Sequence, residues 1–292
     1  METRRIISEI ENGNYDNLFL DIYVDEDKIS YQKQRYVNAI ESYIEEFGED
    51  DVEIYSAPGR SEVGGNHTDH QHGEILAASI NLDAIGIVKK TDDMKVSILS
   101  KGYTLTTISL ENLDMQEEEK ETTIALIKGV VAGLANRGYK IGGFKAYITS
   151  DVLIGAGLSS SAAYETLIGN IVSGLYNNMS VSAEEIAIIG QFAENVYFGK
   201  PCGLMDQMAC SVGNMVHVDF ADINNPKVEK VTFDLNKYGY SLCITDTKGS
   251  HADLTADYAA VPEEMKKVAA FFGKEVLLGL TVDDILENIV KV

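Results

Sequence analysis

Three polar segments of this 292-residue chain contain residues whose types and spacing could do chemistry. In the first, a Gly/Ser loop follows an expected strand and runs directly into an expected helix; it consists of Gly155, Ala156, Gly157, Leu158, Ser159, Ser160 and Ser161. Glycines let the backbone approach a ligand closely, and the helix start offers unpaired N–H groups. Serine hydroxyls can donate to phosphate oxygens or bind Mg²⁺. The loop therefore predicts an anion cradle, although an ordinary strand, turn and serine-capped helix would have the same composition.

The second segment, SAPGRSEVGGNHTDHQHGE, places Arg60, His67 and Asp69 after a Pro-Gly turn. An aspartate can accept from two sugar hydroxyls at once, and an imidazole can donate or accept, so the cluster suits a polyol site. Two other interpretations compete with this one. A zinc site made by His67, His70 and His72 is disfavoured because the histidines are loosely spaced and no sulfur ligand joins them. A merely solvated loop would not explain an arginine in so acidic a chain.

The third segment, AENVYFGKPCGLMDQMACSVG, has two carboxylates on either side of a tight bend. Glu194 ends an expected helix, and Asp206 lies just beyond the Gly-Lys-Pro-Cys-Gly bend. Such a pair can divide the work, with one carboxylate on a metal ion and the other near a reacting hydroxyl. The pattern alone is only moderately specific.

The elements that must position these segments are a mixture of strands and helices without strict alternation, which indicates an α+β fold. Helical spacing marks residues 1–48, and apolar periodicity predicts helices over 121–137, from Ser160 onward, from Ser182 to about 197, and near 262–272 and 281–290. We expect strands over the ranges 52–56, 84–90, 96–100, 144–149, 215–219, 228–233 and 242–245.

Composition limits the possible partners. The chain has 46 acidic and 24 basic residues, a net charge of −22, which disfavours nucleic acid and anionic membranes as partners. Its three cysteines have no zinc-ligand spacing and are typical of reduced thiols. Neither a signal-peptide pattern nor a membrane-spanning apolar stretch is visible. We therefore expect a cytoplasmic protein. We also expect a monomer.

Together and in this order, the three segments resemble the GHMP kinases, and within them the galactokinases. The galactokinase motif Gly-Arg-x-Asn-Leu-Ile-Gly-Glu-His-Thr-Asp-Tyr corresponds to residues 59–70, and Gly-x-Gly-Leu-Ser-Ser-Ser-Ala stands intact at 155–162. The segment Gly-x-Met-Asp-Gln is found at 203–207, and HADLTADY resembles the stretch that brings a tyrosine, here Tyr258, to the sugar. The likeness covers about residues 50 to 275.

The resemblance implies a GHMP kinase fold. It would comprise a helical lead-in (1–48), an N-terminal domain with a left-handed βαβ-type, ribosomal S5-like sheet (49–210), and an incomplete C-terminal α+β domain (211–292). It also implies ATP and Mg²⁺ as cofactors, and galactose or a similar hexose as the partner that is phosphorylated at its C1 hydroxyl.

The resemblance also implies a role for each site residue. Asp206 would accept the C1 proton or orient the hydroxyl, with Arg60 beside it to keep it ionised. The Gly/Ser loop would hold the ATP phosphates, and Ser160 and Glu194 would bind Mg²⁺. The sugar hydroxyls would be held by Asn66, His67, Asp69, Gly203 and Tyr258.

The chain departs from the galactokinase pattern in ways that bear on the sugar. Asn66 stands where the family has glutamate, which removes a charged acceptor, and Ser61-Glu62, Val63-Gly64, His70 and Leu153 also differ. The family's third glycine-rich motif is missing, so we expect a C-terminally truncated fragment with weak activity or none. Alternatives are a GHMP kinase for another small substrate such as N-acetylgalactosamine, a non-catalytic sensor of sugar and ATP, or an inactive remnant.

Overall fold

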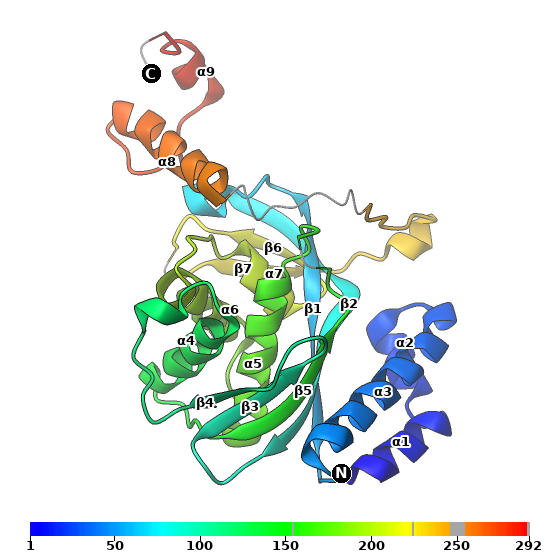
Figure 1. Ribbon diagram of the computed structural model, residues 1–292. Helices are drawn as coiled ribbons and strands as arrows, with labels where there is room; N and C mark the ends of the chain where they lie inside the picture. Colours follow the sequence, from blue (N-terminus) through cyan, green and yellow to red (C-terminus); the bar gives the residue numbers. More distant parts are fainter. Residues whose placement is uncertain (154, 224, 246–254, 291–292) are drawn as a thin grey trace.

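One long strand organises the computed structural model, which describes residues 1–153, 155–223, 225–245 and 255–290, without the side chains of 236 and 255–259 (Figure 1). This strand, β2 (Glu74–Lys90), pairs antiparallel with β1 (Glu53–Gly64) along most of its length. Its second half also pairs with β5 (Phe144–Ser150), and its first half with β6 (Met215–Asp219). Segments far apart in the sequence are thereby joined through β2.

The sheet has the order β4-β3-β5-β2-β6-β7, with β1 on β2. The remaining strands are β3 (Lys95–Ser100), β4 (Thr106–Ser109) and β7 (Lys227–Val231). β3 and β5 run parallel, whereas the other pairs are antiparallel. This mixed sheet with its helices confirms the predicted α+β class.

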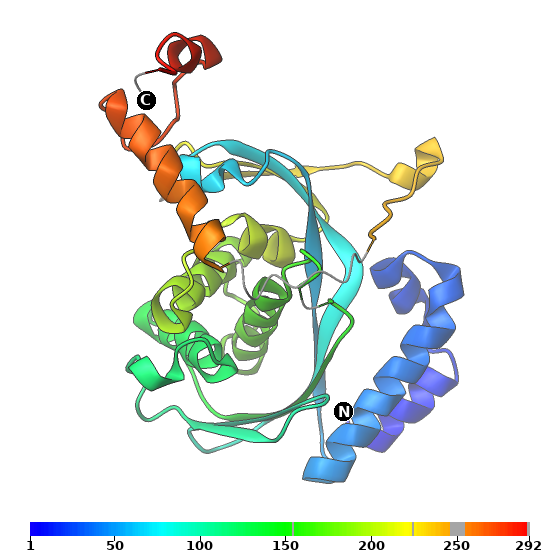
Figure 2. The ribbon, with the colours of Figure 1, turned by 45° about the horizontal axis from the view of Figure 1, so that its top comes forward.

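The helices that follow the strands cover one face of the sheet (Figure 2). They are α4 (Thr123–Asn136), α5 (Ser160–Asn177), α6 (Ala183–Phe192), the π-helix η4 (Ala193–Phe198) and α7 (Met205–Val212). The largest core cluster lies between this layer and the sheet, where Phe144, Leu134 and Leu167 are fully buried. Burying such side chains contributes about 1.5–3 kcal/mol each.

The first helices pack on the opposite face (Figures 1 and 2). They are α1 (Thr3–Glu11), α2 (Asp16–Tyr23), η1 (Glu26–Lys28) and α3 (Ile29–Phe47). Their apolar faces form a second core cluster with the sheet residues Ile85 and Ile87. Charge also ties them to the sheet, because buried Arg35 lies 2.6 Å from Oδ1 of buried Asp83 and 3.3 Å from Oδ2 of Asp151. The helical lead-in is thus anchored next to the start of the Gly/Ser loop.

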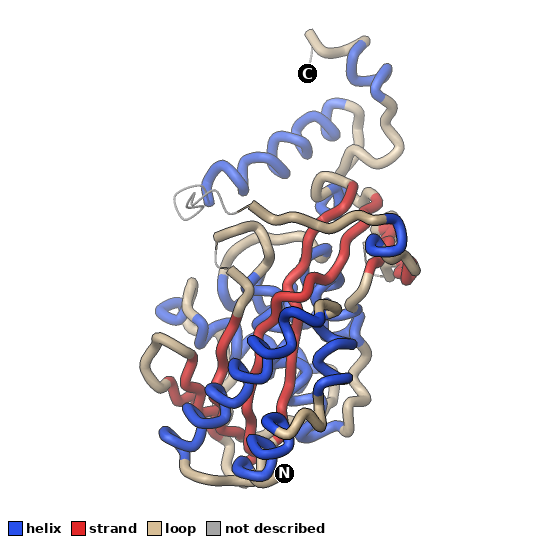
Figure 3. The backbone as a smooth tube through the Cα atoms, turned by 90° about the vertical axis from the view of Figure 1, so that its right-hand side faces the viewer, coloured by secondary structure: helices blue, strands red, loops and turns tan. Residues whose placement is uncertain are grey.

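The last helices extend away from the sheet (Figure 3). α8 (Thr255–Phe271) contacts the short helix η2 (Thr68–Gln71), and the backbone N–H of Leu277 donates to Oε1 of Gln71 at 3.1 Å. The other short elements are η3 (Glu117–Glu119), η5 (Leu235–Tyr238) and α9 (Val282–Leu286). Across the described ranges, no helix has both the length and the apolar character to cross a membrane.

Some expected elements differ from those observed. The expected turn at Pro58-Gly59 is wrong, because β1 continues through it to Gly64; a register shift between Pro58 and Arg60 accommodates the proline. The strand expected over 242–245 is also wrong, since those residues have no regular structure. β4 and α7 were not expected. The division into domains at 48 and 210 stays a prediction.

Candidate active site

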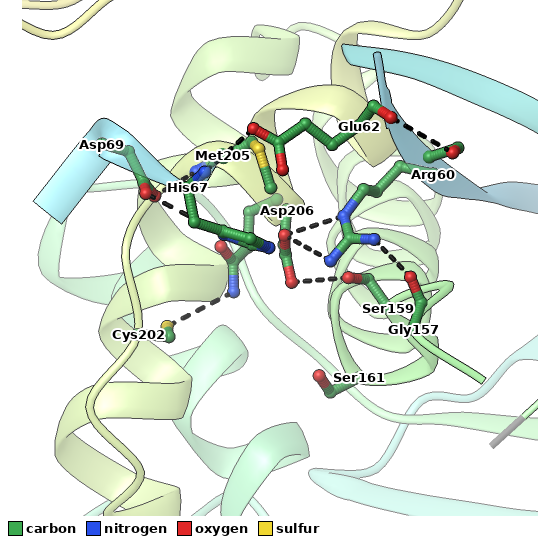
Figure 4. Close-up of polar contacts among 12 residues, drawn as sticks. Arg60, Glu62, His67, Asp69, Gly157, Ser159, Ser161, Cys202, Met205 and Asp206 are labelled. Atoms are coloured by element: carbon green, nitrogen blue, oxygen red, sulfur yellow. Dashed lines mark hydrogen bonds and ion pairs between the residues drawn. The ribbon is translucent and has the colours of Figure 1, made fainter. Parts of the chain in front are cut away.

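Arg60 on β1 and Asp206 in the first turn of α7 form an ion pair at the centre of the site (Figure 4). Nε and Nη2 of Arg60 each lie 2.8 Å from Oδ1 of Asp206. The Arg60 side chain is 8% exposed and the Asp206 side chain 29%, so water reaches the carboxylate. The helix N-terminus adds favourable potential for a negative charge at Asp206.

The Gly/Ser loop lies directly against this pair. A Cβ on Gly59 would lie 2.8 Å from the carbonyl oxygen of Leu158, so only glycine lets β1 and the loop approach so closely. The Arg60 backbone N–H donates to that carbonyl at 3.2 Å, and Nη1 of Arg60 donates to the carbonyl of Gly157. Ser159 Oγ donates to Oδ2 of Asp206. The loop, the guanidinium and the carboxylate therefore converge.

These contacts set the charge of Asp206. Burial alone would raise its pKa, but the positive charge of Arg60 and the hydrogen bonds from Arg60 and Ser159 outweigh burial and lower the pKa. Asp206 is therefore an ionised carboxylate at neutral pH, available as a hydrogen-bond acceptor.

Glu194 lies in the π-helix η4 and forms a second, buried charge cluster next to the loop. Its Oε1 accepts from Ser161 Oγ at 3.2 Å and from Lys200 Nζ at 3.2 Å. Its Oε2 accepts from Nε2 of Gln207 at 2.8 Å. π-helical turns occur frequently at functional sites, where they redirect a side chain. Here the turn brings a carboxylate to the base of the loop.

Gln207 also donates from Nε2 to Oε2 of Glu165, at 3.1 Å. Gln207 is completely buried and Glu165 is 1% exposed. Burial, followed by the nearby charge of Glu194, raises the pKa of Glu165 well above its ordinary value, which favours its neutral form. Neither residue was expected to belong to the site, although Gln207 ends the Gly-x-Met-Asp-Gln segment. The available signal was a glutamate within an otherwise apolar helix, directly after the Gly/Ser loop.

A third group of contacts forms the side of the site away from the loop. Asp69 is 2% exposed, and its Oδ2 accepts from the backbone N–H of Met205 at 3.0 Å. Its Oδ1 has no hydrogen bond among the described residues. A Cβ on Gly203 would lie only 1.7 Å from Oδ2 of Asp69, so the bend must have glycine there. Asp69 is thereby fixed against the backbone of Met205, the residue before Asp206, as seen in Figure 4.

The residues expected to bind magnesium can be tested by their chemistry. Mg²⁺ takes oxygen ligands and is commonly held by one or two carboxylates plus substrate phosphates. Glu194 and a serine hydroxyl fit that pattern. The serine that contacts Glu194 is Ser161, whereas the expected ligand, Ser160, makes no side-chain hydrogen bond within the described part of the chain. Among the described residues, no group of three or more His, Cys, Asp or Glu side chains could hold a metal ion.

The remaining expected residues are less closely tied to the pair. Nδ1 of His67 lies 4.0 Å from Oδ1 of Asp69, and the His67 side chain is 52% exposed. The Asn66 side chain is exposed. The side chain of Tyr258 lies outside the described residues.

Comparisons with known proteins match the segments that form this site. The family described as "GHMP kinases N terminal domain" matches residues 125–214, which include the Gly/Ser loop, Glu194 and Asp206. The "Galactokinase galactose-binding signature" matches residues 41–90, which include Arg60 and Asp69. Residues 125–214 belong to the GHMP kinase family, and residues 41–90 carry its galactokinase signature.

Galactokinases of other organisms match much of the chain. This chain is 28% identical to the galactokinase of Clostridium tetani over 85% of its own length and 36% identical to that of Pyrococcus furiosus over 61%. The crystal structure of Lactococcus lactis galactokinase complexed with galactose matches with a TM-score of 0.70 and 26% identity, over 85% of this chain and 65% of that one. Methanococcus jannaschii mevalonate kinase, at TM-score 0.56 and 17% identity, shares the fold. The chain spans 62% of the length of the Clostridium relative and 49% of the Pyrococcus relative.

Proposed function

We propose that this protein transfers the γ-phosphoryl group of ATP to the C1 hydroxyl of galactose, which gives galactose 1-phosphate in the first step of galactose catabolism. The observation that carries the proposal is the contact of Asp206 with both Arg60 and Ser159 of the Gly/Ser loop. One carboxylate is thus held between a cation and a phosphate-binding loop. That is where a hydroxyl must lie to attack a phosphoryl group.

In this proposal each group of the chain has a positional or electrostatic task. Asp206 orients the sugar hydroxyl and accepts its proton, and Arg60 keeps Asp206 ionised. The N–H groups of the loop from Gly155 to Ser161 bind the phosphates of ATP. Mg²⁺, held by Glu194 and a loop serine, would neutralise charge on the phosphate oxygens. Phosphoryl transfer depends mainly on such positioning and charge stabilisation.

Support for galactose as the acceptor comes from the sugar side of the site. Oδ1 of Asp69 is an unused acceptor in the part of the chain that the structure describes, and a sugar hydroxyl could donate to it. We assign the other hydroxyl contacts to His67, Asn66, Gly203 and Tyr258. The matched galactose-binding signature supports the same acceptor. Asn66, where galactokinases have glutamate, favours N-acetylgalactosamine as the second candidate acceptor.

ADP release with galactose, glucose and N-acetylgalactosamine tests the proposal. We expect galactose to give the highest kcat/KM. A sugar that lacks a hydroxyl at the required position leaves a buried acceptor of the site unpaired, which disfavours that sugar. A matched control is Asp92→Asn, in the turn between β2 and β3, which should keep the wild-type rate. Preference for N-acetylgalactosamine would favour the second candidate, and sugar-independent ATP hydrolysis would reject both.

A further inference from the structure

Glu62 stands on the acceptor side of the site without a role so far. It lies on β1 two positions after Arg60, and the pairing of Arg60 with Ser79 and of Glu62 with Ala77 is regular between them. Side chains two apart on a strand point to the same face. Glu62 therefore projects toward the Arg60–Asp206 pair, and a register shift between Glu62 and Gly64 then turns the chain into the sugar-side loop.

The Glu62 carboxylate holds the backbone of that loop. Its Oε1 accepts from the backbone N–H of His67 at 2.9 Å, a contact visible in Figure 4. Asn66 and His67 have φ angles of 51° and 54°, which is the left-handed backbone conformation that residues other than glycine rarely adopt. The strained pair leads into Asp69, which binds the Met205 backbone next to Asp206. Glu62 thus fixes the turn that positions Asp69.

The contact with the His67 N–H uses only one of the two carboxylate oxygens of Glu62. Oε2 makes no hydrogen bond with any described residue, and the side chain is partly exposed. Arg60 makes no hydrogen bond to this oxygen. Its Nε and Nη2 contact Asp206, and its Nη1 donates to the carbonyl of Gly157. An acceptor molecule entering here would meet a carboxylate oxygen without a hydrogen-bond partner among the described residues. Arg60 attracts both Asp206 and Glu62, so the two carboxylates together carry more charge than this one guanidinium balances.

The sequence adds an independent observation. Aligned with the galactokinase motif, this chain has glutamate where the motif has asparagine, at position 62, and asparagine where the motif has glutamate, at position 66. The two residue types have exchanged places. These two positions thus keep one carboxylate between them. It lies on β1, at Glu62, and contacts the turn through the His67 N–H.

We propose that Glu62 is a specificity-determining residue, whose free carboxylate oxygen accepts a hydrogen bond from a hydroxyl of the acceptor and excludes acceptors that carry a negative charge. The proposal rests on the proposed function, since it assumes a sugar beside Asp206. It narrows the class of acceptor to neutral polyols. It also gives Glu62 two tasks, to hold the His67 N–H and to repel negative charge. A glutamine can perform the first task but not the second, because an amide has no charge.

Isothermal titration of the chain with galactose and with galacturonate, its C6 carboxylate counterpart, separates these tasks. Wild type should bind galactose and bind galacturonate at least about tenfold more weakly, because like charges brought together disfavour binding strongly. Glu62→Gln should keep galactose affinity within about threefold, because the amide oxygen still accepts from the His67 N–H and the sugar hydroxyl can turn to accept from the amide NH2. The same variant should raise galacturonate affinity about tenfold or more. Glu62→Ala, which also loses the contact with the His67 N–H, should weaken galactose binding by about tenfold or more.

Glu53→Gln, at the other end of β1, is the matched control and should leave both affinities unchanged. Thermal melts of all variants show whether a lost affinity reflects unfolding, and Glu62→Gln keeps the test informative if Glu62→Ala fails to fold. An unchanged ratio of galactose to galacturonate affinity in Glu62→Gln, with galactose still bound by wild type, overturns the role of Glu62 and leaves the proposed function intact. Wild type that binds no neutral hexose contradicts the proposed function and this inference together.

Discussion

Arg60 and Asp206 are 146 positions apart in the chain, yet Nε and Nη2 of the arginine both lie 2.8 Å from one carboxylate oxygen of the aspartate. The pair joins β1 to α7 and lies against the Gly/Ser loop. It therefore contributes both to the stability of the fold and to the charge of the proposed site.

Asp206→Asn should lower the free energy of unfolding by about 2 kcal/mol at neutral pH, less than the loss for a fully buried pair because Asp206 is 29% exposed. The pKa of Asp206 is lowered in the folded state. Its stabilisation is therefore fully present above the ordinary pKa of about 3.9 and is lost only as pH falls through the lower folded value. Urea unfolding should show a constant difference from about pH 6 to about pH 8.

A double-mutant cycle with Arg60→Met checks that the loss comes from the pair. Asp206→Asn should lower the free energy of unfolding much less in the Arg60→Met background, because that background has no guanidinium to lose its partner. Equal costs in both backgrounds would mean that the two charges are not coupled.

The three loop serines should have separable effects. Ser161→Ala removes a donor to Glu194 and should raise the Mg²⁺ concentration for half-maximal turnover by about three- to tenfold. Ser159→Ala removes a donor to Asp206 and should lower the rate with an unchanged Mg²⁺ requirement. Ser160→Ala decides which serine binds the metal: an effect larger than that of Ser161→Ala would support Ser160 as the ligand, as the family resemblance implies.

Glu165→Gln should stabilise the protein progressively as pH rises. The pKa of Glu165 is raised by burial and by Glu194. Stability from its neutral form is therefore complete below the ordinary pKa of about 4.3 and is lost as pH rises toward the folded value. A glutamine keeps an acceptor for Gln207 and cannot ionise. Urea unfolding at about pH 5.5 and about pH 8.5 should show the larger gain at the higher pH, and a gain only at the lower pH would contradict the assignment.

Gly203→Ala should displace Asp69 and weaken galactose binding by about tenfold or more, because the new Cβ would lie 1.7 Å from Oδ2 of Asp69. Gly64→Ala is the matched control at the end of β1, where an added Cβ meets no atom within 4 Å. Titration with galactose compares the two variants. Similar affinities would show that the bend at Gly203 can relax without loss of the sugar contact.

Periodicity predicted much of the fold. The helices α4, α5 and α6 have long apolar faces, and β5 and β6 alternate clearly, so each was found within a few residues of its observed bounds. α7 was missed because eight residues are too few to establish a helical period after the bend at Gly203. Residues 242–245 are apolar enough for a strand but do not pair with any described strand.

The site was predictable as three segments in order, but its contacts were not. Residue types and spacing indicated a cradle, a polyol cluster and two carboxylates, and the family resemblance put Arg60 beside Asp206. Three of the contacts that now define the site join separate segments: Ser159 with Asp206, Gln207 with Glu165, and Gln207 with Glu194. The contact of Glu62 with the His67 backbone is local, but it depends on the turn that follows β1. Such contacts depend on where β1, α5 and α7 meet, which local sequence does not specify.

The most direct test of the account is transfer of labelled γ-phosphate from ATP to galactose by wild type and by Asp206→Asn, with galactose affinity measured in parallel. We predict labelled galactose 1-phosphate from the wild type, and in the variant a loss of at least about 100-fold in rate with galactose affinity within about threefold. Transfer that persists in Asp206→Asn at a rate close to wild type would contradict the assignment of this carboxylate as the group that activates the sugar.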